Sequence, residues 1–243
     1  MSTELLLSIL AGVSTVLAAI AVNMVYRYKA RVHVLKQDAV QREFWRRDPH
    51  FSALVGDLSK QTELIVDPIR SYTLYQLARA FAGKEGEIAE VGVYKGGTAR
   101  ILAAASPTKR LHLFDTFQGM PSSDPTIDYH PVGDFSDTSF ERVQTLLSDC
   151  PNVKFHVGTF PDTAGPIVDA RFALVHLDVD NYESNRDALA FFYARMVPGG
   201  AIVFDDYEWQ HTAGIRKSID EFLADKPERV VRTAEYQAVM FKL

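Results

Sequence analysis

The chain has 243 residues, of which 47% are hydrophobic, and its formal net charge is −5. This length suits one α/β domain with an appended segment and leaves enough apolar residues for a real core. Its one cysteine, Cys150, excludes an internal disulfide and fits a reducing cytoplasm, while the acidic balance of the folded part argues against a nucleic-acid partner.

Residues 5–26 form an uncharged, mostly apolar run that is long enough to span a bilayer. A signal peptide would have basic residues before such a run, and none precedes this one. The remaining alternative is a buried core helix. We therefore predict an N-terminal transmembrane anchor over residues 1–26 of a single-pass membrane protein.

Residues 27–65 form a charged, mostly helical juxtamembrane arm in this interpretation. Their excess of Lys and Arg over Asp and Glu predicts that the C-terminal side, with the folded domain, lies in the cytoplasm. The arm is either a solvated helix face or a segment that rests on anionic lipid headgroups.

Residues 66–243 alternate between strand and helix patterns, which is typical of a parallel sheet covered by helices. We expect strands at 87–92, 110–115, 153–157, 172–178, 200–205 and 235–242, and helices at 67–82, 97–105, 137–148, 183–196 and 213–225. Residues 116–136 hold three prolines and show no steady period. Because such long loops in compact domains are usually functional, we predict a lid here, with a mobile insertion as the alternative.

Residues 87–98, EIAEVGVYKGGT, predict a strand, then a tight turn and then a helix N-terminus. At such a place α/β proteins bind the polar part of a nucleotide-like ligand. The glycines follow a Gly-x-x-x-Gly-Gly spacing rather than the Gly-x-Gly-x-x-Gly of dinucleotide-binding proteins, so the ligand need not carry a pyrophosphate. Glu90, two residues before Gly92, suits an ammonium group and so favours a nucleoside that carries an amino acid.

Asp115 ends the next expected strand. An acid at that place can accept hydrogen bonds from both hydroxyls of a ribose. The alternative is a cap for the turn at Thr116 and Phe117.

Acidic residues also follow two later strands, Asp178 and Asp180 after one and Asp205 with Asp206 after the other. If these strands are neighbours, Asp178, Asp205 and Asp206 converge, and a cation would relieve their repulsion. Carboxylates without His or Cys partners suit Mg²⁺. The alternative is that they are helix caps and ordinary loop acids.

Two histidines lie near these acids. His211 follows the Asp pair in the segment YEWQH and is a candidate base or substrate contact. His176 alternates into the strand interior, which favours a packed core histidine.

Four segments occur in one order: EVGVYKGGT, LFDTFQGMP, HLDVDNYES and PGGAIVFDDY. Together they resemble class I S-adenosylmethionine-dependent methyltransferases, and they are most similar to the macrocin O-methyltransferase (TylF/MycF-type) family, from about residue 66 to the C-terminus. The resemblance implies a Rossmann-like α/β fold with a seven-stranded, mostly parallel sheet, an antiparallel last strand and helices on both faces.

The resemblance also implies a set of site residues. S-adenosylmethionine would contact Glu90, Gly92, Tyr94, Gly96, Asp115, Thr116, Gly158, Phe160 and Asp178. Mg²⁺ would bind Asp178, Asp205 and Asp206 together with an acceptor hydroxyl. Apart from the resemblance, we expect Asp178, or else His211, to take the proton. Asp180 departs from the family pattern and could replace or assist Asp178.

The sequence thus predicts a membrane-tethered, Mg²⁺-assisted O-methyltransferase that acts on a glycosylated small molecule or another polyol. Alternatives are a metal-independent methyltransferase on the same fold and a non-catalytic, membrane-anchored module that binds the cofactor. A nicotinamide-dependent oxidoreductase is disfavoured by the glycine spacing. A homo-oligomer is left open.

Overall fold

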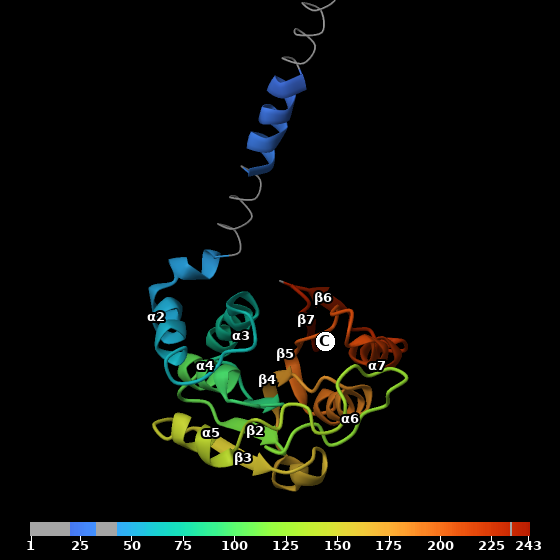
Figure 1. The fold of residues 1–243 in the computed structure, drawn as a ribbon. Helices are drawn as coiled ribbons and strands as arrows, with labels where there is room; N and C mark the ends of the chain where they lie inside the picture. The colour runs from blue at the N-terminus through green and yellow to red at the C-terminus, as the bar shows by residue number, and fades with distance from the viewer. Residues whose placement is uncertain (1–19, 33–42, 234) are drawn as a thin grey trace, which may run out of the picture. The chain divides into compact units, whose positions relative to one another are not determined.

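The computed structural model describes residues 20–32, 43–233 and 235–243 (Figure 1). The chain divides into two compact units, residues 1–47 and 48–243. In the first unit, residues 20–32 are helical and Phe44–Arg47 form a 3-10 helix, η1. In these described ranges no helix combines the length and apolarity needed to cross a bilayer. Most of the predicted span at 5–26 lies outside the described residues, so the anchor stays a prediction.

The second unit begins with helix α2, Pro49–Leu58. Asp48 caps it, since Oδ1 accepts hydrogen bonds from the amides of His50 and Phe51 at 3.0 and 3.1 Å. Phe51, Val55 and Leu58 recur at helical spacing and are buried, and the ring of Phe51 lies 5.1 Å from that of Tyr75 in the next helix. Residues 48–58, expected in the juxtamembrane arm, therefore pack within the second unit.

A seven-stranded sheet forms the centre of this unit, in the order β3-β2-β1-β4-β5-β7-β6. The strands are β1 Glu87–Val91, β2 Leu111–Asp115, β3 Val153–Val157, β4 Phe172–Leu177, β5 Met196–Phe204, β6 Val230–Arg232 and β7 Ala238–Phe241. Strands β1 to β5 pair in parallel and β7 pairs antiparallel to both β5 and β6. The predicted mostly parallel sheet is confirmed, although β6 had no counterpart among the expected strands and β5 begins earlier than expected.

Helices cover the sheet and pack in groups. They are α3 Pro68–Ala80, α4 Gly97–Ala105, α5 Phe140–Leu146, α6 Tyr182–Tyr193 and α7 Ala213–Leu223, with the 3-10 helix η2 at Asp162–Ile167. Helix α6 packs against α7, α3 packs against α4, and both α3 and α6 contact β4. Figure 1 shows α2, α3 and α4 gathered apart from α6 and α7, with strands between them.

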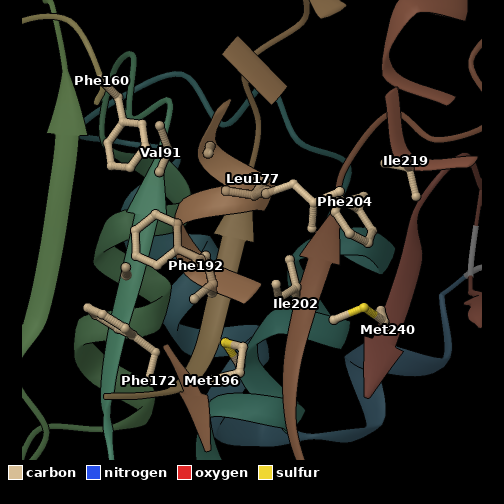
Figure 2. Close-up of a cluster of buried hydrophobic side chains, with 14 of the residues drawn as sticks. Val91, Phe160, Phe172, Leu177, Phe192, Met196, Ile202, Phe204, Ile219 and Met240 are labelled. Carbon is tan, nitrogen blue, oxygen red and sulfur yellow. The ribbon is translucent and has the colours of Figure 1, made fainter. Parts of the chain in front are cut away.

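The main apolar cluster lies between the sheet and helices α6 and α7. Figure 2 shows Val91, Leu177 and Phe204 from the strands together with Phe192 of α6 and Ile219 of α7. Because side chains alternate along a strand, the neighbours of Val91 and Leu177 within their strands, Glu90 and His176, lie on the opposite face.

The carboxyl ends of β1 and β4 create the place for a ligand. From β1 the chain moves to β2 on one side, whereas β4 pairs with β1 on the other, so these two ends form a topological switch point. The amide of Asp178 donates to the carbonyl of Val91 at 2.9 Å. The turn after β1 and the acid after β4 therefore start from adjacent positions.

Candidate active site

A cavity of about 460 Å³ opens at this sheet edge, a size usual for small-molecule sites. Its lining includes the predicted residues Gly92, Tyr94, Asp115, Thr116, Gly158, Phe160, Asp178, Asp205 and Asp206. Three predicted residues, Glu90, Gly96 and His211, are not part of this lining.

Gly92 brings the β1 turn into direct contact with the end of β4. Its φ is +87°, and a Cβ at this position would lie 1.8 Å from the carbonyl oxygen of Asp178. Only glycine fits both the left-handed conformation and the close approach. The turn and Asp178 are therefore held in one fixed relation.

Asp115 organises the two turns that face the cavity. Its Oδ2 accepts hydrogen bonds from the amides of Val93 and Tyr94 at 2.7 and 2.8 Å, and its Oδ1 accepts one from Phe117 at 2.7 Å. Tyr94 and Phe117 have positive φ values of 50° and 53°, a costly conformation that the surrounding contacts must maintain. Asp115 thus makes the cap contact that the sequence left as an alternative to ribose binding.

The glycine pair at the start of α4 serves packing. A Cβ on Gly96 would lie 2.9 Å from Cγ1 of Val143, and one on Gly97 would lie 2.8 Å from Cδ1 of Leu64. Gly97 also lines the cavity, whereas Gly96 faces α5. Close packing therefore accounts for Gly96, which the sequence had suggested as a point of ligand approach.

Glu90 and His176 form a fully buried pair beneath the cavity. His176 Nδ1 lies 2.8 Å from Glu90 Oε1, and its Nε2 lies 3.7 Å from Asp205 Oδ1. Burial alone would lower the pKa of His176, but the carboxylates of Asp205 and Glu90 outweigh it and raise this pKa to about 10. Glu90 is not part of the cavity lining, and its Oε1 is paired with His176. Its contact with an ammonium group stays a prediction.

Two groups of side chains at the cavity floor are close enough to share a cation. Asp178, Asp180 and Asp206 form one, and His176, Asp178 and Asp205 form the other, with ligand atoms in each group within 4.8 Å of one another. Asp180, which the sequence suggested could replace or assist Asp178, belongs to the first group.

Burial and mutual repulsion make these carboxylates easy to protonate. Burial, followed by the charge of Asp205, raises the pKa of Asp178 well above its ordinary value and that of Asp206 to about 7. Burial and the charge of Asp206 likewise raise the pKa of Asp180. A cation placed among them would be strongly attracted.

Arg70 of α3 already brings a positive charge to this site. Its Nη1 donates to Asp205 Oδ2 and, at 3.2 Å, to Asp206 Oδ1, while Gln237 Nε2 donates to Asp205 Oδ1 at 3.0 Å. The Arg70 side chain is 13% exposed, and its Nε is buried without a hydrogen-bond partner in the described part of the chain. No sequence pattern indicated this residue, since 135 positions separate it from Asp205.

The segment 116–136 covers one side of the cavity, as the lid prediction expected, and Met120, His130 and Phe135 contribute to the lining. Its base is closed by backbone bonds between Met120 and residues 133 and 134 at 3.0 and 2.8 Å. Asp128 Oδ1 accepts a hydrogen bond from the amide of Tyr182 at 2.9 Å, and Asn181 Nδ2 donates to the carbonyl of Ser122 at 3.1 Å. The segment is therefore docked on the first turn of α6.

His211 lies outside this cavity, in the turn before α7. Its ring packs against Tyr129 and Trp209, with centroids 4.5 and 5.2 Å away. The short loop after Asp206 places Trp209, and not His211, in the cavity wall.

Residues 75–242 match the model of the family described as macrocin-O-methyltransferase (TylF). The chain belongs to this family. The resemblance seen in the four sequence segments is thereby confirmed.

Two curated proteins are similar to this chain. One is 8-demethyl-8-(2,3-dimethoxy-alpha-L-rhamnosyl)-tetracenomycin-C 4′-O-methyltransferase of Streptomyces olivaceus, 32% identical over 51% of this chain and 54% of its own length. The other is mycinamicin III 3″-O-methyltransferase of Micromonospora griseorubida, 34% identical over 51% of this chain and 56% of its own. The chain thus aligns with only about half the length of these curated relatives.

Solved structures support the fold of this family member. The O-methyltransferase NovP superposes with a TM-score of 0.65 at 22% identity, over 74% of this chain and 81% of that one. The calicheamicin methyltransferase CalS11 superposes with a TM-score of 0.60 at 17% identity, over 81% of this chain and 92% of that one. At such identities the likeness establishes the α/β methyltransferase fold.

Proposed function

We propose that this chain is an S-adenosylmethionine-dependent O-methyltransferase that acts on a hydroxyl of a sugar or another polyol. The observation that carries the proposal is the direct contact between the Gly92 turn and Asp178, which joins a donor-binding turn to a cluster of partly buried acids in one cavity. S-adenosylmethionine, when bound, supplies an electrophilic methyl group.

Residues from three strand ends favour this methyl donor. The turn at Gly92 and Tyr94, where both residues have positive φ values, leaves backbone groups at the cavity wall. Asp115 holds that turn through Oδ2, which accepts two hydrogen bonds, while Oδ1 accepts only one and keeps a lone pair for a ribose hydroxyl. Gly158 and Phe160 line the same cavity after β3 and offer a flat apolar wall for a base.

The acid cluster fits a hard divalent cation such as Mg²⁺. Asp178, Asp180 and Asp206 offer oxygen ligands only, which such ions prefer. Asp205, the remaining predicted ligand, already contacts Arg70. A cation there would lower the pKa of an acceptor hydroxyl.

The chain's own residues would supply positioning and proton transfer. Asp178 and Asp180 are partly buried carboxylates with raised pKa values, which suits a group that accepts a proton from a hydroxyl. The fixed contact between Asp178 and the Gly92 turn orients the acceptor oxygen toward the methyl group. The lid segment excludes water from this reaction.

The acceptor class draws support from the relatives. The Streptomyces olivaceus enzyme is named for a rhamnosyl substrate and the Micromonospora griseorubida enzyme for mycinamicin III. The aromatic wall formed by Phe135 and Trp209 suits the apolar face of a sugar ring.

Isothermal titration with S-adenosylmethionine, with and without Mg²⁺, tests the proposal. We expect saturable binding at one site in both conditions. A screen of glycosylated acceptors with radiolabelled donor then reads out transfer. A protein that does not bind S-adenosylmethionine at all would contradict the proposal.

A metal-independent reaction on the same fold is the second candidate, and Arg70 favours it. This guanidinium neutralises part of the acid cluster from within the chain. Transfer that survives EDTA would support this candidate over the first.

Replacing Arg70 tests whether its guanidinium competes with a metal ion for the acid cluster. We expect Arg70→Met to bind Mn²⁺ at least about tenfold more tightly than the unchanged protein, because a competing charge is removed. Without metal the variant should melt at a lower temperature, since a partly buried ion pair is broken, and Mn²⁺ should restore it. Electron paramagnetic resonance of Mn²⁺ and thermal melting measure both effects.

Arg79→Met is the matched control, because Arg79 lies on the same helix but is 55% exposed and contacts Asp48. Equal Mn²⁺ affinity in Arg70→Met and Arg79→Met would show that Arg70 does not compete with a metal.

The membrane tether predicted over residues 1–26, with the folded domain in the cytoplasm, remains part of the proposal. It would bring the enzyme to an acceptor carried on a lipid.

A further inference from the structure

His130 is a partly buried histidine of the lid segment that lines the cavity. Its side chain is 12% exposed, and its ring centroid lies 4.8 Å from that of Phe135 and 5.8 Å from that of Trp209. All three residues line the cavity. The imidazole is thus fixed between two aromatic rings and has little freedom to turn.

Asp134 determines which ring nitrogen of His130 is available to a ligand. His130 Nδ1 lies 3.0 Å from Asp134 Oδ2. Because an ionised carboxylate only accepts, Nδ1 carries the hydrogen of this bond. In the neutral ring Nε2 is then the bare nitrogen, an acceptor held in a set direction.

Nε2 has no protein group to satisfy it. The atom is buried and makes no hydrogen bond to any residue that the structure describes. Buried polar atoms are nearly always paired, so an unpaired one in a cavity wall calls for a ligand group. Its partner must be a donor, and a hydroxyl is the donor that a polyol supplies.

The acids of the cluster line the same cavity as this imidazole, and they include Asp178, Asp180 and Asp206. A ligand in this cavity would therefore have the lid histidine on one side and the acid cluster on another. This suits a ring with several hydroxyls better than a molecule with one.

We propose that His130, oriented by Asp134, binds a hydroxyl of the methyl acceptor through Nε2, with Phe135 and Trp209 against the apolar face of its sugar ring. This assignment rests on the proposed function, because it names the lid's contribution to acceptor binding. His130 is in this sense an acceptor-binding residue that selects polyols, and Asp134 is a positioning residue.

The probe is methyl α-L-rhamnopyranoside, titrated by ligand-detected NMR into the full chain saturated with S-adenosylhomocysteine. His130→Phe keeps the ring packing and removes both nitrogens. We expect it to bind the rhamnoside at least about tenfold more weakly and to retain its affinity for S-adenosylhomocysteine. Tyr129→Phe, at a lid position outside the cavity lining, is the control that should leave rhamnoside binding unchanged.

Two conservative variants separate binding from support of the lid. His130→Gln can place an amide near the position of Nε2 and should recover part of the rhamnoside affinity. His130→Asn can replace only the bond of Nδ1 to Asp134 and should not. A purely structural role for His130 predicts the reverse order, and that order would overturn the proposal.

Other outcomes are equally decisive. Unchanged rhamnoside affinity in His130→Phe overturns the assignment of His130 alone. No rhamnoside binding by the unchanged protein overturns it together with the sugar class of acceptor. In that case binding of S-adenosylhomocysteine shows that the donor part of the proposed function still stands. Should His130→Phe not fold, the Gln and Asn pair gives the same decision.

Discussion

Asp178→Asn should lower the rate of methyl transfer about 10²- to 10⁴-fold, the usual contribution of a positioned acid or base. Asp178 belongs to both candidate cation-binding groups and contacts the Gly92 turn through its backbone. An amide of the same shape preserves that backbone contact, so the affinity for S-adenosylmethionine should be largely retained. Radiolabelled transfer assays and isothermal titration measure the two quantities.

The melting temperature of Asp178→Asn shows whether a loss of activity comes from misfolding. Burial and the charge of Asp205 raise the pKa of Asp178 in the folded chain, so its ionised form disfavours folding as the pH rises above the ordinary pKa. A neutral amide removes that penalty. Asp178→Asn should therefore melt at the same temperature as the unchanged protein at neutral pH, or higher. Full activity in this variant would refute the role of Asp178.

Gly92→Ala should damage both the fold and the donor site. The new Cβ would lie 1.8 Å from the carbonyl oxygen of Asp178, and the residue would have to keep a φ of +87°. Backbone strain of this kind costs about 1–3 kcal/mol, and displacement of the β4 end adds to it. We expect a fall in melting temperature of about 10 °C and loss of measurable binding of S-adenosylmethionine.

Gly56→Ala is a suitable control for that measurement. Gly56 lies within α2, and a Cβ there would meet no atom within 4 Å. Alanine should stabilise the helix by about 0.5–1 kcal/mol. If Gly92→Ala and Gly56→Ala had the same melting temperature, the close approach at Gly92 would not affect stability.

The sequence was a good guide where a pattern is local. Apolar runs and the acids that end them located β1, β2 and β4 to within a residue or two. The short strand β6 escaped prediction because it has only three residues, and Val231 at its centre is 54% exposed. Such a segment lacks the alternation that identifies a strand.

Long-range side-chain partners could not be read from local patterns. Arg70 lies in helix α3 and reaches Asp205 because α3 packs against β4, the neighbour of β5 in the sheet. His130 lay in a loop without periodicity, and its bond to Asp134 depends on how that loop folds back. Glu90 is a different case. Side chains alternate along a strand, so the sequence could have predicted that Glu90 and Val91 lie on opposite faces of the sheet.

The docking of segment 116–136 on α6 ties access to the cavity to the integrity of a helix. Asp128 accepts a hydrogen bond from the first amide of α6, and Asn181, which caps that helix through Ser184, also holds the carbonyl of Ser122. Moving the segment aside would leave a helix N-terminus without part of its cap. Opening the cavity on this side would therefore loosen the first turn of α6, so the stability of that turn and the closure of the cavity depend on the same hydrogen bonds.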